Sequence, residues 1–317
     1  MMRRRTLPLL ALAGPAFAQA WPSRAIRIIV PVPPGGGTDI LTRLIQPQLA
    51  ERLGQNIIIE NRPGGGSTIG TNLVATAAPD GHTLLMIDSA LAVNPFLYAR
   101  LPFDTERDLQ PVSLLATAPV ILVTHPSFPP ATVSELLAYA RANPGRVNFA
   151  SGGNGASTHL AGEMLRMVAG IDIVHVPFSG TGPGVTALLG GQTQMMFAGI
   201  SSTRQHVETA RLRALAVTGA ARSPALPGVP TFTEAGLPGM SAETIWGLWA
   251  PRETPPAIGE RMAREAAAIL AMPELRARAI DLGFVPEGST PAEFRVRFTR
   301  ELALWGPIVR QSGARAD

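Results

Sequence analysis

The sequence contains no cysteine and, although 27 of its residues are basic, no lysine. The missing cysteine excludes disulfides, thiolate zinc sites and thiol catalysis. The missing lysine excludes a Walker phosphate loop, a Schiff base and protein-kinase chemistry. Because only two tyrosines titrate between histidine and arginine, a formal net charge of +4 is enough to give a pI near 10.7. The high pI therefore does not by itself indicate a nucleic-acid partner.

The first twenty residues follow the order of an export signal. Arginines at 3–5 precede a short apolar run, and small residues follow at Ala16, Ala18 and Ala20. The run is too short to span a bilayer, so the pattern predicts a signal peptide over 1–20, cleaved near Ala20 and exported by the general or the twin-arginine route. Three of the 27 basic residues lie in this segment, which leaves 24 against 23 acidic ones. We expect an exported protein that lies outside the inner membrane, is not membrane-embedded and binds no nucleic acid.

Short β-branched runs alternate with helical patterns along the rest of the sequence. Strands are predicted at 26–30, 56–60, 83–87, 120–124, 147–150, 171–176, 194–198, 212–218 and 244–250. Helices are predicted at 38–53, 72–78, 132–141, 157–168, 261–270, 273–282 and 291–311. Strands separated by helices predict an α/β fold with mainly parallel sheets.

Three glycine-rich turns, at 33–39, 151–159 and 177–184, each follow a predicted strand and precede a helix. Glycine lets a ligand approach the backbone, and the N–H groups of a first helical turn are donors for an anion. None of the turns has the dinucleotide fingerprint or a phosphate-loop lysine. Thr38, Asp39 and Ser157 also suit ordinary N-caps, so simple loop chemistry is the alternative. Three such turns in one chain favour a carboxylate or phosphate site.

Catalytic patterns are few. The five histidines form no H-E-x-x-H, and no G-x-S-x-G occurs. His159 lies near Ser157 and Thr158, so it either pairs with a serine or has a structural role. Asp88 and Ser89 end a predicted strand and either line a cleft or form a turn. We predict no catalytic residue, metal site or cofactor, and keep an exported serine hydrolase as the alternative function.

Ordered motifs across almost the whole chain resemble the substrate-binding proteins of tripartite tricarboxylate transporters, the Bug or TctC-like family. The motifs are RIIVPVPPGGGTD at 27–39, ENRPGGG at 60–66, APDGHTLL at 78–85, NP at 94–95, SGGNGASTHL at 151–160, HVPF at 175–178, LLGGQ at 188–192, LRALAVT at 212–218, RSPALP at 222–227 and GLWAP at 247–251.

The resemblance implies a type II periplasmic-binding-protein fold, in which two α/β lobes close on a small organic anion without catalysis. It also implies two crossings between lobes, near 120–124 and 244–250. We therefore expect one lobe from 21–121 plus 247–317 and a second from 122–246. The implied partners are a small carboxylate and the membrane permease subunits of the transporter, and we expect a monomer. A receptor that feeds a sensor instead of a transporter is the further alternative.

In this family the turns at 33–39 and 151–158 hold the ligand carboxylate, largely through backbone N–H groups and bridging water. The expected ligand-binding residues are Val32, Pro34, Gly35, Gly36, Gly37, Thr38, Asp39, Ser89, Ser151, Asn154, Gly155, Ala156, Ser157, Thr158, Phe178, Gly180, Thr181 and Ala198. Two of them depart from the family pattern, because Val32 replaces a common aromatic residue and Ala198 a frequent aspartate. The missing aspartate argues against a ligand that bears an ammonium group.

Overall fold

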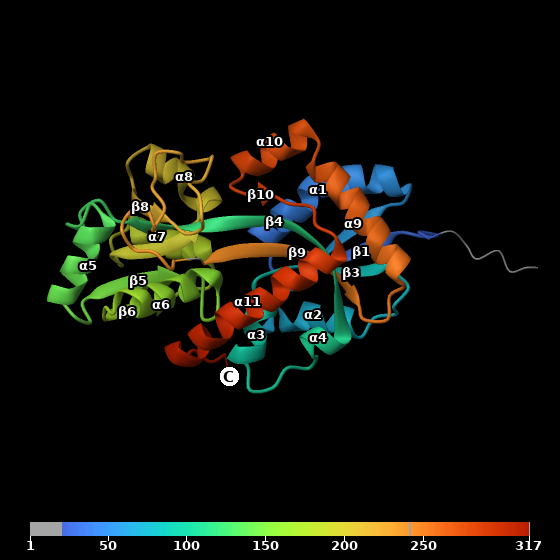
Figure 1. Cartoon of the computed structure of the whole chain (residues 1–317), viewed down its shortest axis with the longest axis horizontal. Coiled ribbons are helices and arrows are strands. Elements are labelled where there is room, and N and C mark those ends of the chain that lie inside the picture. The colour runs from blue at the N-terminus through green and yellow to red at the C-terminus, as the bar shows by residue number, and fades with distance from the viewer. Residues whose placement is uncertain (1–20, 241, 317) are drawn as a thin grey trace, which may run out of the picture.

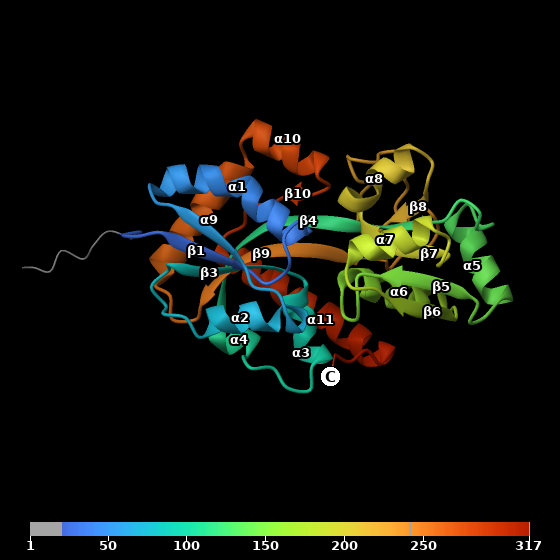
Figure 2. The same cartoon turned by 180° about the vertical axis from the view of Figure 1, so that it is seen from behind.

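The computed structural model describes residues 21–240 and 242–316. Figures 1 and 2 show two lobes side by side, and two long strands, β4 (Leu109–Thr124) and β9 (Glu243–Pro251), run between them. Both strands are buried along almost their whole length, because helices and neighbouring strands of the two lobes surround them. The two-lobed α/β architecture expected from the sequence is therefore present.

The first lobe is built on three parallel strands in the order β2 (Ile57–Asn61), β1 (Ile26–Val30) and β3 (Thr83–Asp88). Isoleucine and valine dominate β1, as expected for a strand buried on both faces. The helical elements of this lobe are α1 (Gly37–Leu53), the short 3-10 turn η1 (Gly65–Ser67), α2 (Thr68–Ala75), α3 (Ala90–Leu97), α4 (Thr105–Asp108), α9 (Pro256–Leu270), α10 (Pro273–Asp281) and α11 (Pro291–Ser312).

The second lobe repeats this design with the parallel strands β7 (Met195–Gly199), β5 (Val147–Ser151) and β6 (Ile173–Pro177). It also contains β8 (Arg213–Val217), α5 (Val133–Ala142), α6 (Ser157–Ala169), α7 (Thr181–Leu189) and α8 (Ile200–Glu208). In each lobe the first parallel strand runs into a glycine-rich turn and then a helix, so the turns before α1 and α6 occupy corresponding positions.

The long strand β4 changes partners where the lobes meet. Its residues Leu109–Pro119 pair antiparallel with β9, and Val120–Thr124 pair antiparallel with β7 and β8. The main strand order is β2-β1-β3-β9-β4-β7-β5-β6, and β8 and β10 (Val285–Pro286) also pair with β4. Each lobe therefore has a parallel unit of three strands, as expected, and the crossing strands make the whole sheet mixed.

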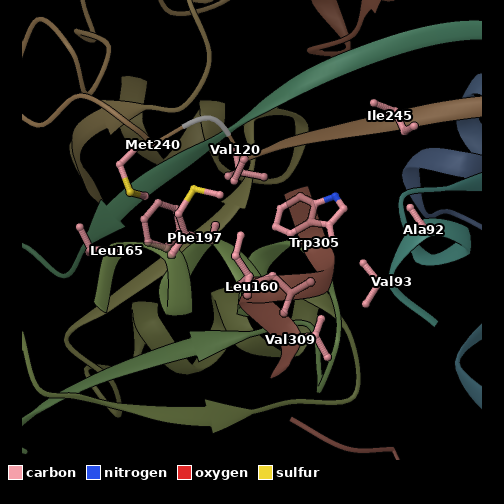
Figure 3. Packing of buried hydrophobic residues seen from close by; sticks show 14 of the residues in the cluster. Ala92, Val93, Val120, Leu160, Leu165, Phe197, Met240, Ile245, Trp305 and Val309 are labelled. Carbon is pink, nitrogen blue, oxygen red and sulfur yellow. The ribbon is translucent and has the colours of Figure 1, made fainter. Parts of the chain in front are cut away.

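The largest group of buried apolar side chains extends through both lobes (Figure 3). Ala92 and Val93 come from α3, Leu160 from α6 and Phe197 from β7, and Trp305 of α11 lies among them without solvent exposure. Burial of a large apolar side chain contributes about 1.5–3 kcal/mol. Because α11 contacts both α3 and α6, its apolar face ties the two lobes together on one side.

The sequence patterns found most elements but not all. The strand at 26–30 is confirmed at its predicted bounds, and α6 and α11 begin at the predicted residues. α2 begins at Thr68, four residues before the prediction. β4 begins at Leu109, far before the predicted residue 120. The first part of this strand was missed because a strand that is buried on both faces shows no alternation of apolar and polar residues. The sequence patterns did not predict α3 or α8. α3 contains Pro95, a residue that disfavours the interior of a helix.

Replacement of Gly247 by alanine tests the packing of β9 against α11. A methyl group there would overlap the ring of Phe294, which is 1% exposed and has no room to move away. We expect Gly247→Ala to lower the free energy of unfolding by about 1–3 kcal/mol in urea denaturation. The matched control is Gly228→Ala, where nothing lies within 4 Å of the added carbon. Equal stability of the two variants would contradict this packing.

Candidate functional site

Two adjoining cavities of about 410 and 510 Å³ lie between the lobes. They share a wall formed by both lobes. The shared residues are Val32, Pro33, Gly36, Gly37 and Asp88 from the first lobe, and Ser157, Thr158, Ser179, Gly180 and Thr181 from the second. All three glycine-rich turns found in the sequence therefore meet at one place.

The helices that begin at these cavities lack side-chain caps. The N-cap residues are Gly36 for α1, Ala156 for α6, Gly180 for α7 and Gly199 for α8, and none provides a side-chain hydrogen bond to its helix. Among the other helices, the N-cap residues Asp104, Thr132 and Thr290 cap α4, α5 and α11, whereas those of α2, α3, α9 and α10 make no such bond. First-turn N–H groups need an acceptor and carry partial positive charge. The cavities are thus suited to an anion.

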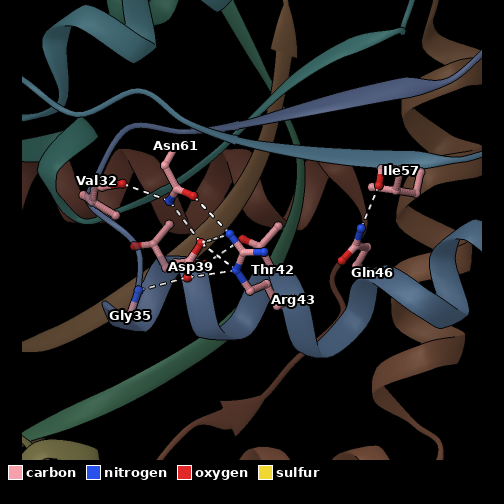
Figure 4. Close-up of polar contacts among 9 residues, drawn as sticks. Val32, Gly35, Asp39, Thr42, Arg43, Gln46, Ile57 and Asn61 are labelled. Carbon is pink, nitrogen blue, oxygen red and sulfur yellow. Dashed lines mark hydrogen bonds and ion pairs between the residues drawn. The ribbon is translucent and has the colours of Figure 1, made fainter.

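The turn before α1 is supported from beneath by Asp39 (Figure 4). Gly35 has a φ of +85° and donates its N–H to Asp39 Oδ2 at 2.9 Å, and Arg43 and Asn61 also donate to this carboxylate at 3.0 Å. Burial raises the pKa of Asp39, but these hydrogen bonds outweigh burial and hold the pKa below its ordinary value. Asp39 is buried and lines neither cavity, so its role is to fix the turn.

The turn before α6 is supported by two histidines. Ser151 Oγ lies 2.6 Å from His175 Nε2 and accepts the Gly153 N–H at 3.1 Å, and Gly155 donates its N–H to His159 Nδ1 at 3.1 Å. The two imidazole rings stack with centroids 3.8 Å apart. Ser151 and His159 are both buried, so they hold the turn from behind the cavity wall.

Burial keeps both imidazoles neutral. Burial, aided by His175 and Arg166, lowers the pKa of His159 to about 3. Burial also lowers the pKa of His175 to about 4. A neutral His159 leaves Nδ1 free to accept from Gly155, so the protonation state of the pair and the shape of the turn are linked.

Fourteen of the expected residues line the cavities, and four do not. The lining residues are Val32, Pro34, Gly35, Gly36, Gly37, Thr38, Ser89, Asn154, Gly155, Ala156, Ser157, Thr158, Gly180 and Thr181. The four that do not are Asp39 and Ser151, described above, together with Phe178 and Ala198. Phe178 is partly buried and packs against the second-lobe core, and Ala198 is fully buried in β7. The position of Ala198 means that its side chain faces the core and not either cavity.

Several lining residues were absent from the expected set. Gly66, Ser67, Ala90, Asn94 and Leu97 line the smaller cavity, and Asn94 donates to the Gly66 carbonyl at 2.9 Å. Trp246 and Phe284 line the larger cavity from the segment that returns to the first lobe. The motifs at 60–66 and 94–95 contain part of this wall. Only the fold reveals that they face the cavity, since α3 had no helical signal.

Side chains also connect the elements around the cavities. Trp246 Nε1 donates to Thr38 Oγ1 at 3.2 Å, and the Ile245 N–H donates to Ser89 Oγ at 3.0 Å, so β9 is tied to the starts of α1 and α3. On the side of the second lobe, Thr244 Oγ1 of β9 donates to Ser157 Oγ at the start of α6 at 3.0 Å. These bonds fix the cavity walls relative to the crossing strand.

The structure does not pair a serine with His159 in the way that the sequence suggested. The serine within hydrogen-bond reach of an imidazole in the cluster is Ser151, and its partner is His175. Ser151 is fully buried and does not line a cavity. Within the described residues, no group of three or more histidine, aspartate or glutamate side chains is placed to hold a metal ion.

Two α/β lobes joined by crossing strands, with helix N-termini around the cavities between them, define a solute-binding protein. The chain belongs to the tripartite tricarboxylate transporter family receptors, the TctC family, whose family model matches residues 41–314. BugT from Bordetella pertussis is 35% identical over 96% of this chain and 94% of its own length.

Two solved structures of relatives contain carboxylates. R. palustris Rpa4515 with adipate has 30% identity and a TM-score of 0.85, covering 93% of this chain and 99% of that one. MatC from Rhodopseudomonas palustris with bound malate has 35% identity and a TM-score of 0.79, covering 91% and 100%. The family and fold recognised from the sequence motifs are confirmed, and the family is one of periplasmic binding proteins.

Acid should lower the free energy of unfolding through the two stacked histidines, His159 and His175. Their pKa values are about 3 and 4 in the folded protein against an ordinary 6.5. The unfolded chain therefore binds protons first, and stability present above pH 6.5 is lost as the pH falls toward 3. We expect the pH slope of the unfolding free energy over this range, measured in urea, to shrink in His159→Phe. His125→Phe, outside the stack, is the control and should keep the wild-type slope; an unchanged slope in His159→Phe would refute this assignment.

Proposed function

We propose that this protein binds a small organic carboxylate in the two cavities and delivers it to the permease subunits of a tripartite tricarboxylate-type transporter. The observation that carries the proposal is the meeting of uncapped N-termini of α1, α6 and α7 at one shared wall. Relatives with adipate and malate support a carboxylate as ligand. Within 21–240 and 242–316, no helix is long and apolar enough to cross a membrane.

In this proposal backbone N–H groups provide most of the hydrogen bonds to the ligand. First-turn N–H groups of α1, α6 and α7 bind the carboxylate oxygens, and Asn154, Thr158 and Thr181 orient the rest of the ligand. Micromolar affinity requires about 8 kcal/mol. The ligand closes the lobes by binding the closed form more tightly than the open form. Val32 provides an aliphatic wall between the two cavities.

The division into lobes 21–121 plus 247–317 and 122–246 belongs to the same proposal. The change of β4 partners at Pro119 and Val120, and the start of β9 at Glu243, lie close to both proposed crossings and support it. Periplasmic location fits the family; the proposed signal peptide at 1–20 lies outside the described residues. A monomer is proposed, since one chain supplies both sides of the cavities.

Thermal unfolding with carboxylates tests the binding proposal. Adipate or malate at 100 times its dissociation constant should stabilise the protein by about 2.7 kcal/mol. Gly36→Val should abolish that shift, because the valine side chain enters the shared wall while the local φ of −79° accepts any residue. The control Gly228→Val lies in open space. Absence of a shift with a broad carboxylate panel would reject the proposal.

The same samples separate binding from hydrolysis and from sensing. A binding protein returns its ligand chemically unchanged, and ester turnover that disappears in Ser151→Ala would instead favour the serine hydrolase. Delivery to a transporter is tested by uptake of labelled ligand into vesicles that contain the permease. Ligand-dependent signalling without uptake would favour the sensor alternative.

A further inference from the structure

One ionisable side chain, that of Asp88, lines the two cavities. Among their described lining residues it is the sole carrier of a formal charge, and it belongs to the wall that both cavities share. It stands at the end of β3, where α3 begins. A site suited to an anion therefore contains an acid of the same charge sign, and binding must resolve this conflict.

The surroundings of Asp88 supply hydrogen bonds but no positive side chain. Asp88 Oδ1 accepts the Ala90 N–H at 3.0 Å, and the Thr38 hydroxyl, itself bonded to Trp246, also donates to this carboxyl. Burial raises the pKa of Asp88 against these hydrogen bonds. Across the cavities, α6 and α7 present Ser157, Thr158 and Thr181. These three side chains are neutral.

The charged groups on the neighbouring elements are engaged elsewhere. On α1, Asp39 is bonded to Arg43 and Asn61 behind the turn. On β9, Glu243 pairs with Arg297 of α11 at 3.0 Å. No counter-ion from these elements lines the cavities with Asp88. Two carboxylates that lie close together in one cavity resist ionising together, and a shared proton removes the repulsion.

We propose that a dicarboxylate binds together with one proton, held in a hydrogen bond between Asp88 and a ligand carboxylate. This inference rests on the proposed carboxylate-binding function. The proton comes from solvent, the Asp88 carboxyl becomes the neutral donor, and the ligand oxygen accepts; no other bond is made or broken. An ammonium-bearing ligand would use Asp88 differently, as an ionised acceptor. The missing acid at Ala198 therefore does not alone decide against amino acids, because Asp88 supplies one from the other lobe.

Calorimetry of adipate and malate binding between pH 7 and 9, in buffers of different ionisation enthalpy, measures the protons taken up. We expect uptake that rises toward one proton per ligand, with affinity falling up to tenfold per pH unit. Asp88→Asn should bind without proton uptake and with little pH dependence. The control is Asp172→Asn, which alters an exposed carboxyl outside the cavities and should behave as wild type.

The outcomes separate this inference from the proposed function. Adipate or malate binding to wild type without proton uptake would overturn the proton-sharing proposal and leave carboxylate binding intact. Glutamate or aspartate that binds more tightly than adipate and malate, with this binding lost in Asp88→Asn, would overturn the proton-sharing proposal in favour of an ionised Asp88. Failure of every carboxylate with wild type and variant would reject the proposed function as well. If Asp88→Asn does not fold, the wild-type proton count still decides.

Discussion

The absence of side-chain caps at the starts of α1, α6 and α7 is the constraint on which the candidate site depends. A buried donor without an acceptor is costly, and a side-chain cap is the usual solution. In this protein glycine or alanine stands at each of these three N-caps, which leaves the donors open toward the space between the lobes. In the proposed function, an anion that reaches this space accepts hydrogen bonds from the starts of three helices at once.

Each lobe holds its turn in place by a different chemistry. The first lobe uses charge, with Asp39 bonded to Gly35, Arg43 and Asn61. The second lobe uses neutral groups, with Ser151 bonded to His175 and Gly155 bonded to the stacked His159. Since these supports lie behind the wall, the surface presented to a ligand is mostly backbone. Asp88 is the exception, because its carboxyl reaches the same wall.

The sequence motifs were sufficient to identify the family, and the strand and helix patterns were sufficient to predict most of the secondary-structure elements. The site was predicted less completely, because Ser151 and Asp39 follow the same glycine-rich signals as the lining residues but point away from the cavities. Local sequence does not reveal which side of a turn faces a ligand. Ala198 illustrates the same limit, since the family pattern suggested a site residue at this position and the fold places its side chain in the core.

By itself, the sequence determined the family, through ordered motifs in a chain that has no lysine or cysteine and carries three glycine-rich strand-to-helix turns. These features depend only on residue type and on the order of neighbouring residues, so the sequence shows them directly. The tertiary structure alone decided that the three turns meet, that α3, α8 and Trp246 enclose them, and that Asp88 shares their wall. These are contacts between residues far apart in sequence, fixed by the crossing of β4 and β9 and by no local pattern.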